Sequence, residues 1–307
     1  MTMRDAFFYR IFEKAKQSPD IVVLTSDFSA PSFDRFRTEL PGQFINTGIS
    51  EQNTMLVAAG LAHSGKKVFV TSIAPFIVMR CYEQTRLYAA DMNFDVKIVA
   101  VGAGFSYNTS GPTHHAVEDI SLMRALPNMN VIMPCGNNQV EGAAEWCVSS
   151  KSPAYIRLDR MNLNELYDNS FYVDDAGFNV WKNTDNIMFL ASGYMTHTAV
   201  KIVKMLNDKG IDAGIIDLYK IPVDKTALVD SIKHVKKLVT IEEHVRSGGI
   251  GSYINELLVD SNCHLSLKCF ALDFSKGLYH RYGTRDEIHE ACGIGKESIL
   301  RSLEGLL

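Results

Sequence analysis

The sequence predicts an α/β protein of two domains, each built on a parallel sheet. Short, continuously apolar runs alternate with amphipathic stretches along the chain, a pattern typical of parallel strands covered by helices on both faces. One stretch, residues 159–186, is rich in Asn, Asp and Tyr and interrupts the alternation as a linker. The chain has 307 residues, 46% of them hydrophobic, which is enough for two cores. We therefore expect a larger domain over residues 1–178 and a smaller one over residues 186–307.

The first domain is predicted to contain six strands, identified from its apolar, β-rich runs. They lie over residues 21–27, 43–48, 66–72, 96–102, 130–134 and 154–158. Periodicity between these runs predicts helices over residues 3–17, 50–65, 76–91 and 137–149. The helix over 50–65 ends at Gly65 and is crowded with small residues, so a neighbouring element can pack closely against it.

The second domain repeats the alternation after the linker. Its predicted strands lie over residues 187–193, 213–218, 236–243 and 267–272, and its helices over residues 195–209 and after Gly251. Ligands of such sheets bind beyond the carboxyl ends of the parallel strands. The informative loops of the first domain are therefore 26–33, 46–52, 72–76, 102–115 and 157–162.

Composition and charge exclude several classes of protein. The formal net charge of -4 gives no basic excess for binding nucleic acid. No apolar run is long enough for a membrane helix, and the amino terminus lacks the apolar core of a signal peptide. The six cysteines have no paired spacing, which argues against disulfides and zinc and favours reduced thiols. We expect a cytoplasmic protein with neither nucleic-acid nor membrane partners.

Two glycine-rich segments approach nucleotide-binding patterns without completing them. GAGFSY (102–107) follows a predicted strand, but Tyr107 stands where the third glycine of a dinucleotide fingerprint belongs. GGIG (248–251) opens a helix with the wrong spacing. His114 and His115 are adjacent, so they cannot face one metal as an i, i+4 helical pair would. We expect no metal ligands from this chain.

The most informative motif is NTGISEQN, over residues 46–53. It places Glu51 in the first turn of the small-residue helix, directly after a predicted strand. A structural role would also explain this arrangement, with Ser50 as the N-cap and Glu51 as acidic charge near the positive end of the helix dipole. The residues of this motif alone leave both interpretations open.

Further segments follow this motif in a fixed order. They are SIAPFIVMRCYEQTR (72–86), SGPTHHAVED (110–119), ALPNMNVIMP (125–134), SPAYIRLDR (152–160) and TIEEHVRSGGIGSYINELL (240–258). The series closely resembles the transketolase family, and more narrowly the pyrimidine-binding half of thiamine-diphosphate-dependent transketolases and deoxyxylulose-phosphate synthases. The resemblance covers essentially the whole chain. It implies a pyrimidine-binding domain with the thiamine-diphosphate-binding fold, followed by a transketolase C-terminal domain.

The resemblance assigns a role in the chemistry to Glu51. This residue matches the glutamate that hydrogen-bonds the aminopyrimidine ring of thiamine diphosphate, so that the exocyclic nitrogen of the ring can take a proton from the thiazolium carbon. Burial of a carboxyl group favours its protonated form, which suits this role. The resemblance implies that the cofactor then serves as the electron sink in ketol transfer.

Aromatic side chains clasp the pyrimidine ring in this family, and Phe76 and Tyr82 match them. Met79 stands where a second Phe is typical, and Ile73 stands where related enzymes often have an aromatic residue. Methionine is adaptable enough to fill such a gap. Asp27, in TSDFSAPS, matches an aspartate near the cofactor. A plain core role for Phe76 and Tyr82, and a loop-capping role for Asp27, stay open.

Substrate-binding residues follow from the same resemblance. His114, in GPTHH, matches the active-site histidine that contacts substrate oxygens, whereas His115 replaces a more usual Gln. Arg4, Ser32 and Arg160 match three of the four residues that hold the substrate phosphate, and arginine suits the geometry of phosphate.

Two positions in the loop 102–113 depart from the family pattern. Gly102 stands where the fourth phosphate ligand, a histidine, is usual, and Ser110 stands where an acidic residue senses sugar hydroxyls. We therefore expect a transketolase-type enzyme that transfers a two-carbon ketol unit and uses a non-standard donor or acceptor sugar.

The resemblance also predicts a partner subunit. Full-length transketolases carry a further domain ahead of these two, which binds the diphosphate and Mg²⁺ of the cofactor. Neither a GDG motif nor an acidic metal loop of that type occurs in this sequence. We expect a heteromer, α2β2, in which two copies of this chain supply Glu51 and the partner subunit supplies the ligands of the diphosphate and Mg²⁺.

Other functions stay open at this point. The β-subunit of a 2-oxoacid dehydrogenase and a deoxyxylulose-phosphate-synthase-like enzyme share the two-domain layout, although the GPTHH and RCYEQTR segments favour the transketolase branch. A non-catalytic regulatory subunit or scaffold would need neither Glu51 nor His114.

Overall fold

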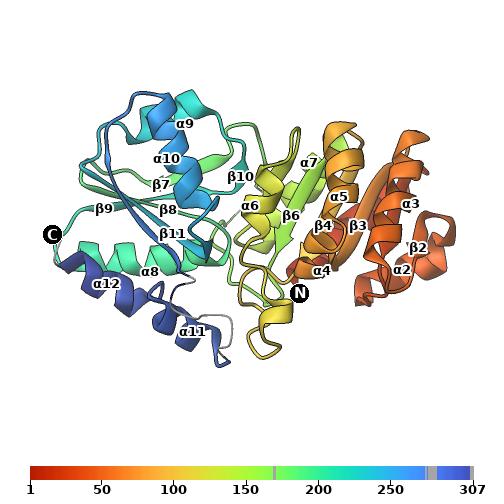
Figure 1. The fold of residues 1–307 in the computed structure, drawn as a ribbon, viewed down its shortest axis with the longest axis horizontal. Helices are drawn as coiled ribbons and strands as arrows, with labels where there is room; N and C mark the ends of the chain where they lie inside the picture. The colour runs from red at the N-terminus through yellow and green to blue at the C-terminus, as the bar shows by residue number, and fades with distance from the viewer. Residues whose placement is uncertain (169–170, 274, 276–281, 305–307) are drawn as a thin grey trace.

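Two α/β units lie side by side in the computed structural model, which describes residues 1–168, 171–273, 275 and 282–304 (Figure 1). Each unit has one mostly parallel sheet with helices on both faces. This architecture confirms the predicted fold class.

The sheet of the first unit contains all six predicted strands. They are β1 (Ile21–Thr25), β2 (Phe44–Asn46), β3 (Lys67–Ile73), β4 (Val96–Val101), β5 (Asn130–Ile132) and β6 (Ala154–Leu158). These six strands are parallel and lie in the order β5-β6-β4-β3-β1-β2. The continuous apolar runs predicted them correctly because each of the long strands is buried on both faces.

A seventh strand of this sheet comes from the second half of the chain. β10 (Lys220–Ile221) pairs antiparallel with the edge strand β5. The two units are therefore joined by backbone hydrogen bonds as well as by side-chain packing. A strand of two residues is too short to give a periodic pattern, and the sequence did not predict it.

Helices cover both faces of the first sheet. α1 (Met3–Ala15), α2 (Pro31–Glu39) and α7 (Asn137–Ser149) share one hydrophobic cluster with the sheet. α3 (Glu51–His63), α4 (Ala74–Met79) and α6 (Asp119–Arg124) share another. The helix predicted over 76–91 is broken into α4, the short α5 (Tyr82–Gln84) and a π-helical turn, Thr85–Asp91.

The second unit has the sheet order β12-β11-β8-β9-β7. The four predicted strands are present as β8 (Ile187–Ala191), β9 (Ala213–Leu218), β11 (Lys237–Val245) and β12 (Ser266–Leu272). The fifth, β7 (Phe178–Lys182), lies inside the predicted linker and pairs antiparallel with β9. It was missed because it is a half-buried edge strand without an apolar run.

Helices also flank the second sheet. They are α8 (Tyr194–Asp208), α9 (Lys225–Ile232), α10 (Ile250–Asp260), α11 (Arg285–Cys292) and α12 (Lys296–Glu304). Only α8 and α10 were predicted from the sequence. In the described residues, no helix is long and apolar enough to span a membrane.

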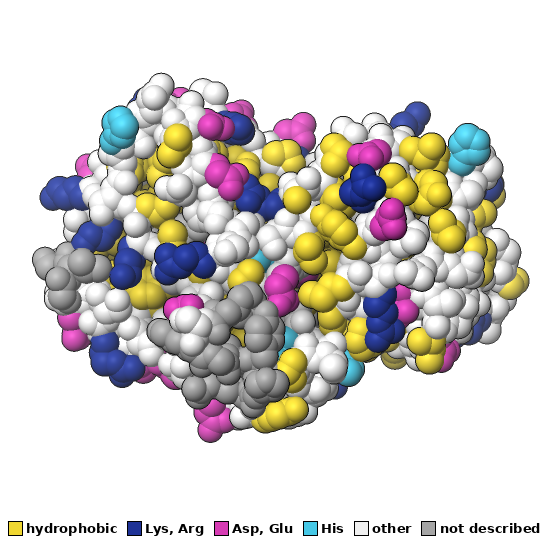
Figure 2. Space-filling view, viewed as in Figure 1, with side chains coloured by type: hydrophobic (Ala, Val, Ile, Leu, Met, Phe, Trp, Pro, Cys, Tyr) yellow, Lys and Arg dark blue, Asp and Glu magenta, His cyan; other side chains and the backbone are white. Residues whose placement is uncertain are grey.

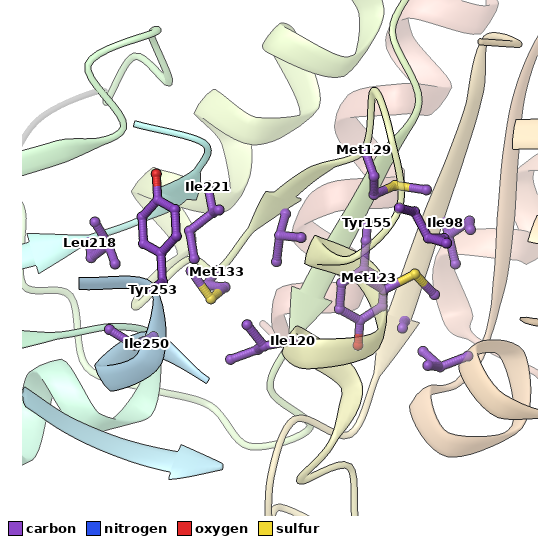
Figure 3. Packing of buried hydrophobic residues seen from close by; sticks show 14 of the residues in the cluster. Ile98, Ile120, Met123, Met129, Met133, Tyr155, Leu218, Ile221, Ile250 and Tyr253 are labelled. Carbon is purple, nitrogen blue, oxygen red and sulfur yellow. The ribbon is translucent and has the colours of Figure 1, made fainter. Parts of the chain in front are cut away.

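One hydrophobic cluster runs through both units. Figure 3 shows Ile221 and Tyr253 of the second unit beside Met133 of the first, and all three belong to this cluster. The backbone N–H of Val223 also donates a hydrogen bond to the hydroxyl of Tyr253, at 3.0 Å. A shared apolar core of this kind fixes the two units relative to one another.

Candidate active site

The carboxyl ends of five parallel strands bring the predicted site residues to one edge of the first sheet. The strand order β6-β4-β3-β1-β2 fixes the order of the loops along this edge. Arg160 follows β6 at one end, and Glu51 lies beyond β2 at the other. The loops that follow β4 and β3 lie between them. Residues far apart in the sequence therefore meet at the edge where parallel sheets bind ligands.

Glu51 is the first residue of α3 and is 5% exposed. Its Oε1 accepts a hydrogen bond of 3.0 Å from Nη1 of Arg80. Ser50 stands at the N-cap, but its side chain makes no capping hydrogen bond and its hydroxyl instead donates to the carbonyl oxygen of Thr47. The interpretation of Ser50 as a helix N-cap therefore lacks the side-chain hydrogen bond that it requires.

Contacts between side chains continue from Glu51 towards the middle of the edge. The Arg80 guanidinium lies over the ring of Phe76, 3.9 Å from its centroid. The rings of Phe76 and His114 meet edge to face, with centroids 5.1 Å apart. The sequence did not single out Arg80, although it lies one helical turn beyond Phe76, where the two side chains share a helix face.

His114 lies in a short 3-10 turn, Pro112–His114, at the end of the loop that follows β4. Burial lowers its pKa, and the positive charge of Arg80 lowers it further. The imidazole is therefore neutral near pH 7 and can both accept and donate a hydrogen bond. Its Nδ1 is 2.9 Å from Oγ1 of Thr113.

The row of contacts ends at Arg160. The rings of His114 and Tyr107 have centroids 5.7 Å apart, and the Arg160 guanidinium lies 4.7 Å from the centroid of Tyr107. We call Glu51, Arg80, Phe76, His114, Tyr107 and Arg160 the contact row. From the sequence, Tyr107 was noted only as the residue that spoils a nucleotide-binding pattern. The signal that could have identified Tyr107 as a site residue is an aromatic side chain within a glycine-rich loop.

A pocket of about 510 Å³ adjoins the Arg160 end of the row. Eight residues line it: Thr2, Arg4, Val101, Tyr107, Asp159, Arg160, Met161 and Asn162. Arg4 donates to the carbonyl oxygen of Ser29 and lies 3.5 Å from Asp5, whereas Arg160 has no ion pair among the described residues. We call this the anion pocket because two guanidinium groups line it and the charge of Arg160 is left for a bound anion.

Ser32 lies outside the anion pocket. It is fully buried, and its hydroxyl donates to Oδ1 of Asp5 at 3.0 Å. Burial raises the pKa of Asp5, but hydrogen bonds from Thr2 and Ser32 and the charge of Arg4 together lower it below its usual value. As placed here, Ser32 acts on Arg4 only through the carboxylate of Asp5.

The remaining predicted cofactor residues take varied positions. Tyr82 is half-buried, and its hydroxyl donates to the carbonyl oxygen of Leu122 at 2.8 Å. Met79 is 40% exposed on α4, and Ile73 ends β3. Asp27 is exposed and has a positive φ of 54°, with its carboxylate accepting from Asn46. None of these four belongs to the contact row.

Three other predicted positions lie in or next to the loop that follows β4. His115 is 3% exposed, packs edge-on against Phe105, and has no hydrogen bond to either ring nitrogen within the described part of the chain. Ser110 is exposed at the tip of the loop. Gly102 has a φ of 112°, a conformation that favours glycine. In the same described part, no group of three or more His, Cys, Asp or Glu could hold a metal ion.

Several large hydrophobic side chains near Glu51 are exposed. Ile49, which is 76% exposed, directly precedes the first turn of α3, and Leu56 lies on that helix. Figure 2 shows hydrophobic side chains gathered on the face over which Figure 1 draws α3, α4 and α5. Apolar patches of this kind mark protein interaction surfaces.

The matches to known proteins span nearly the whole chain. The transketolase pyrimidine-binding domain family matches residues 1–165, and the transketolase C-terminal domain family matches residues 178–299. The chain is 34% identical to one subunit of the apulose-4-phosphate transketolase of Phocaeicola vulgatus, over 97% of this chain and 95% of that protein.

Two further proteins agree with this assignment. A 6-deoxy-6-sulfo-D-fructose transketolase subunit of a Clostridium species is 29% identical, over 98% of this chain and 92% of that subunit. A solved structure described as a split gene transketolase, inactive beta4 tetramer, superimposes with a TM-score of 0.89 at 31% identity. It is matched over 99% of this chain and 98% of that one.

Proposed function

The chain belongs to the transketolase family, and from this premise we propose that it is the subunit of a split, thiamine-diphosphate-dependent enzyme that transfers a two-carbon ketol unit between phosphorylated sugars. The single observation that carries the proposal is the contact row, which links the buried carboxylate of Glu51 to the anion pocket at Arg160.

The residues at the Glu51 end suit the aminopyrimidine part of thiamine diphosphate. Oε1 of Glu51 pairs with Arg80, and within the described residues no hydrogen bond engages Oε2. The half-buried ring of Phe76 offers an apolar surface beside this carboxylate. A carboxyl oxygen without a partner, next to an aromatic ring, can share a proton with a heteroaromatic ring nitrogen stacked on that ring. When bound, the cofactor would supply the carbon nucleophile and the electron sink for breaking a carbon–carbon bond.

Side chains of the contact row and of the anion pocket then have separate tasks. Glu51 is placed to share a hydrogen bond, and its proton, with the ring of the cofactor. His114, neutral near pH 7, exchanges protons with substrate oxygens near the reacting carbons. Arg4 and Arg160 hold the phosphate of the substrate and so fix its distance from His114. Phe76, with Arg80 above it, separates the cofactor end from the substrate end.

The substrates are proposed to be ketoses with an anionic group at one end. The two named relatives act, by their names, on apulose 4-phosphate and on 6-deoxy-6-sulfo-D-fructose, so subunits of this type serve unusual sugars with a terminal anion. The departures at Gly102 and Ser110 lie in the loop that borders the anion pocket. They support a donor or acceptor different from that of standard transketolases.

A partner subunit is part of the proposal. The ligands of the diphosphate and Mg²⁺ are assigned to this partner, in a complex that contains two copies of each chain. Exposed hydrophobic side chains lie near Glu51 and include Ile49 and Leu56. They support an interface with the partner subunit at this face. The relatives named as subunits support the division of the enzyme between chains.

Reconstitution tests this function directly. The chain is mixed with a companion subunit that carries a GDG diphosphate motif, together with thiamine diphosphate and Mg²⁺, and a panel of phosphorylated ketoses is screened as donors. We expect turnover by the mixture and none by this chain alone. Turnover by the chain alone would refute the division of the site, and turnover of a 2-oxoacid with a lipoyl acceptor would assign the complex to the dehydrogenase branch instead.

A further inference from the structure

Tyr107 lies between the two ends of the substrate path. Its ring is 5.7 Å from the ring of His114 and 4.7 Å from the Arg160 guanidinium, as measured from its centroid. It also lines the anion pocket. Any substrate that reaches from His114 to the two arginines must therefore pass this ring.

The ring of Tyr107 takes the space that a side chain at position 102 would need. A Cβ atom on Gly102 would lie 2.6 Å from Cε2 and 2.7 Å from Cδ2 of Tyr107, which is closer than carbon atoms approach. The φ of 112° at Gly102 also disfavours a side chain there. Gly102 therefore leaves the volume that the ring of Tyr107 fills.

The loop that carries Tyr107 is held by contacts with the second unit and by a hydrogen bond within the loop. The side-chain amide of Asn108 donates to the carbonyl oxygen of Gly283, at 2.5 Å. A Cβ on Gly111 would lie 2.7 Å from the hydroxyl oxygen of Tyr282, so the loop passes close to the segment that precedes α11. Within the loop, the backbone N–H of Ser110 donates to the carbonyl oxygen of Tyr107. These contacts fix the course of the loop backbone on which the Tyr107 ring is carried.

The charge environment of the hydroxyl agrees with a packing role. Burial raises the pKa of Tyr107, although the charges of Arg160 and Arg4 oppose this rise. The phenol is therefore neutral at working pH, and its ring offers an uncharged, rigid face to the Arg160 guanidinium. Stacking of this kind holds a guanidinium in one orientation.

We propose that Tyr107 determines which phosphorylated ketoses the enzyme accepts, because its ring limits the space beside Gly102 and holds the Arg160 guanidinium in place. This inference rests on the proposed function. Differences in the filling of a pocket change discrimination between substrates by about 10–200-fold per small group. Removal of a whole ring should shift the preference towards longer ketoses by at least about 10-fold.

The experiment compares Tyr107→Ala, Tyr107→Phe and wild type in the reconstituted complex. For each of these proteins, kcat/KM is measured with phosphorylated ketoses of five, six and seven carbons. In Tyr107→Ala we expect the ratio of the longest to the shortest substrate to rise at least about 10-fold. Tyr107→Phe keeps the ring and should keep the wild-type ratio. Tyr172→Ala is the matched control, because Tyr172 is 80% exposed and lies outside the pocket.

An unchanged ratio in an assembled Tyr107→Ala complex would overturn the inference and leave the proposed function intact. A ratio shifted equally by Tyr107→Phe would also overturn it, since the hydroxyl and not the ring would then set the preference. A wild-type complex that turns over no ketose would defeat the proposed function, and the inference with it.

Binding of inorganic phosphate to the chain gives a second measurement if Tyr107→Ala does not assemble. Tyr107→Leu retains apolar volume but not the face on which Arg160 stacks. Isothermal titration calorimetry should show phosphate binding weakened by about 2–5-fold in this variant, the loss expected for a cation–π contact. Equal affinity in wild type and Tyr107→Leu would contradict the stacking role.

Discussion

Two arginines lie near the end of β6, and their surroundings are opposite. Arg285 is 4% exposed and pairs with Glu243 through two nitrogens and with Asp159 at 2.6 Å. Arg160, the residue next to Asp159, is exposed in the anion pocket, where it lies over the ring of Tyr107 and makes no ion pair or hydrogen bond among the described residues. An arginine whose partners are all present holds the fold together, whereas one without them keeps a charge that an anion can pair with.

The buried side of this comparison is an ion cluster of Asp159, Arg285, Glu243 and His289. His289 lies 2.5 Å from Oε1 of Glu243. Burial raises the pKa of Glu243, but Arg285 and His289 together bring it well below its usual range. Because Asp159 belongs to the first unit and the other three to the second, the cluster fastens the backbone next to Arg160 to the C-terminal domain.

Loss of Arg285 should have the largest effect on stability. Arg285→Met leaves the buried carboxylates of Glu243 and Asp159 without the guanidinium that pairs with both. We expect a loss of about 3–5 kcal/mol in the free energy of unfolding. Urea denaturation of the purified chain measures it. A loss below about 1 kcal/mol would show that the cluster is less important than its burial suggests.

Loss of Arg160 should affect the enzyme and not the fold. In the reconstituted complex, Arg160→Ala should reduce kcat/KM for a phosphorylated ketose by about 10–100-fold, mainly through KM, because a charge-assisted contact is lost. The free energy of unfolding should change by no more than about 0.5 kcal/mol. An unphosphorylated ketose is the control and should lose little. An equal loss for both ketoses would show that Arg160 does not bind the phosphate of the substrate.

Acid should weaken the buried cluster through Glu243. Its pKa is lowered in the folded state, so its contribution is complete above the unfolded value of about 4.3 and is lost as the pH falls towards the folded value. The difference in unfolding free energy between wild type and Glu243→Gln is followed from pH 6 downwards. Below pH 4 it should narrow by about 1.4 kcal/mol per pH unit. A constant difference down to pH 3.5 would contradict this.

An exposed ion pair gives the smallest expected effect. Arg37 pairs with Asp34 on α2 at 2.7 Å, with both side chains well exposed. Arg37→Met should leave the urea midpoint unchanged, within about 0.5 kcal/mol of free energy, because water screens the pair. A larger loss would mean that exposure does not explain the contrast between Arg285 and Arg160.

The sequence predicted the parts of this molecule that depend on local pattern. All ten strands inferred from apolar runs are present, and the carboxyl-end rule correctly placed Glu51, His114 and Arg160 at one edge. Helices α2, α6, α9, α11 and α12 were missed, as were the edge strand β7 and the crossing strand β10. Short or half-buried elements carry little periodicity, and their position is decided by tertiary packing.

Individual site contacts were harder to predict than strands. The pairing of Arg80 with Glu51 joins the end of α4 to α3, and the cluster around Arg285 joins both units, so neither leaves a signal in neighbouring residues. Ser32 is buried against Asp5, outside the anion pocket, because α2 packs its start onto α1. Resemblance to a family transfers residue types well, but the partners of each residue depend on this fold.

Replacement of Glu51 is the most direct test of the central claim, that this chain supplies the acid that activates the cofactor. Glu51→Ala and Glu51→Gln are assayed for ketol transfer in the reconstituted complex, whose assembly is followed by size-exclusion chromatography. We predict normal assembly and turnover reduced by about 10²–10⁴-fold in both variants, the range for loss of a general acid or base. A fully assembled Glu51→Ala complex with wild-type turnover would contradict the account.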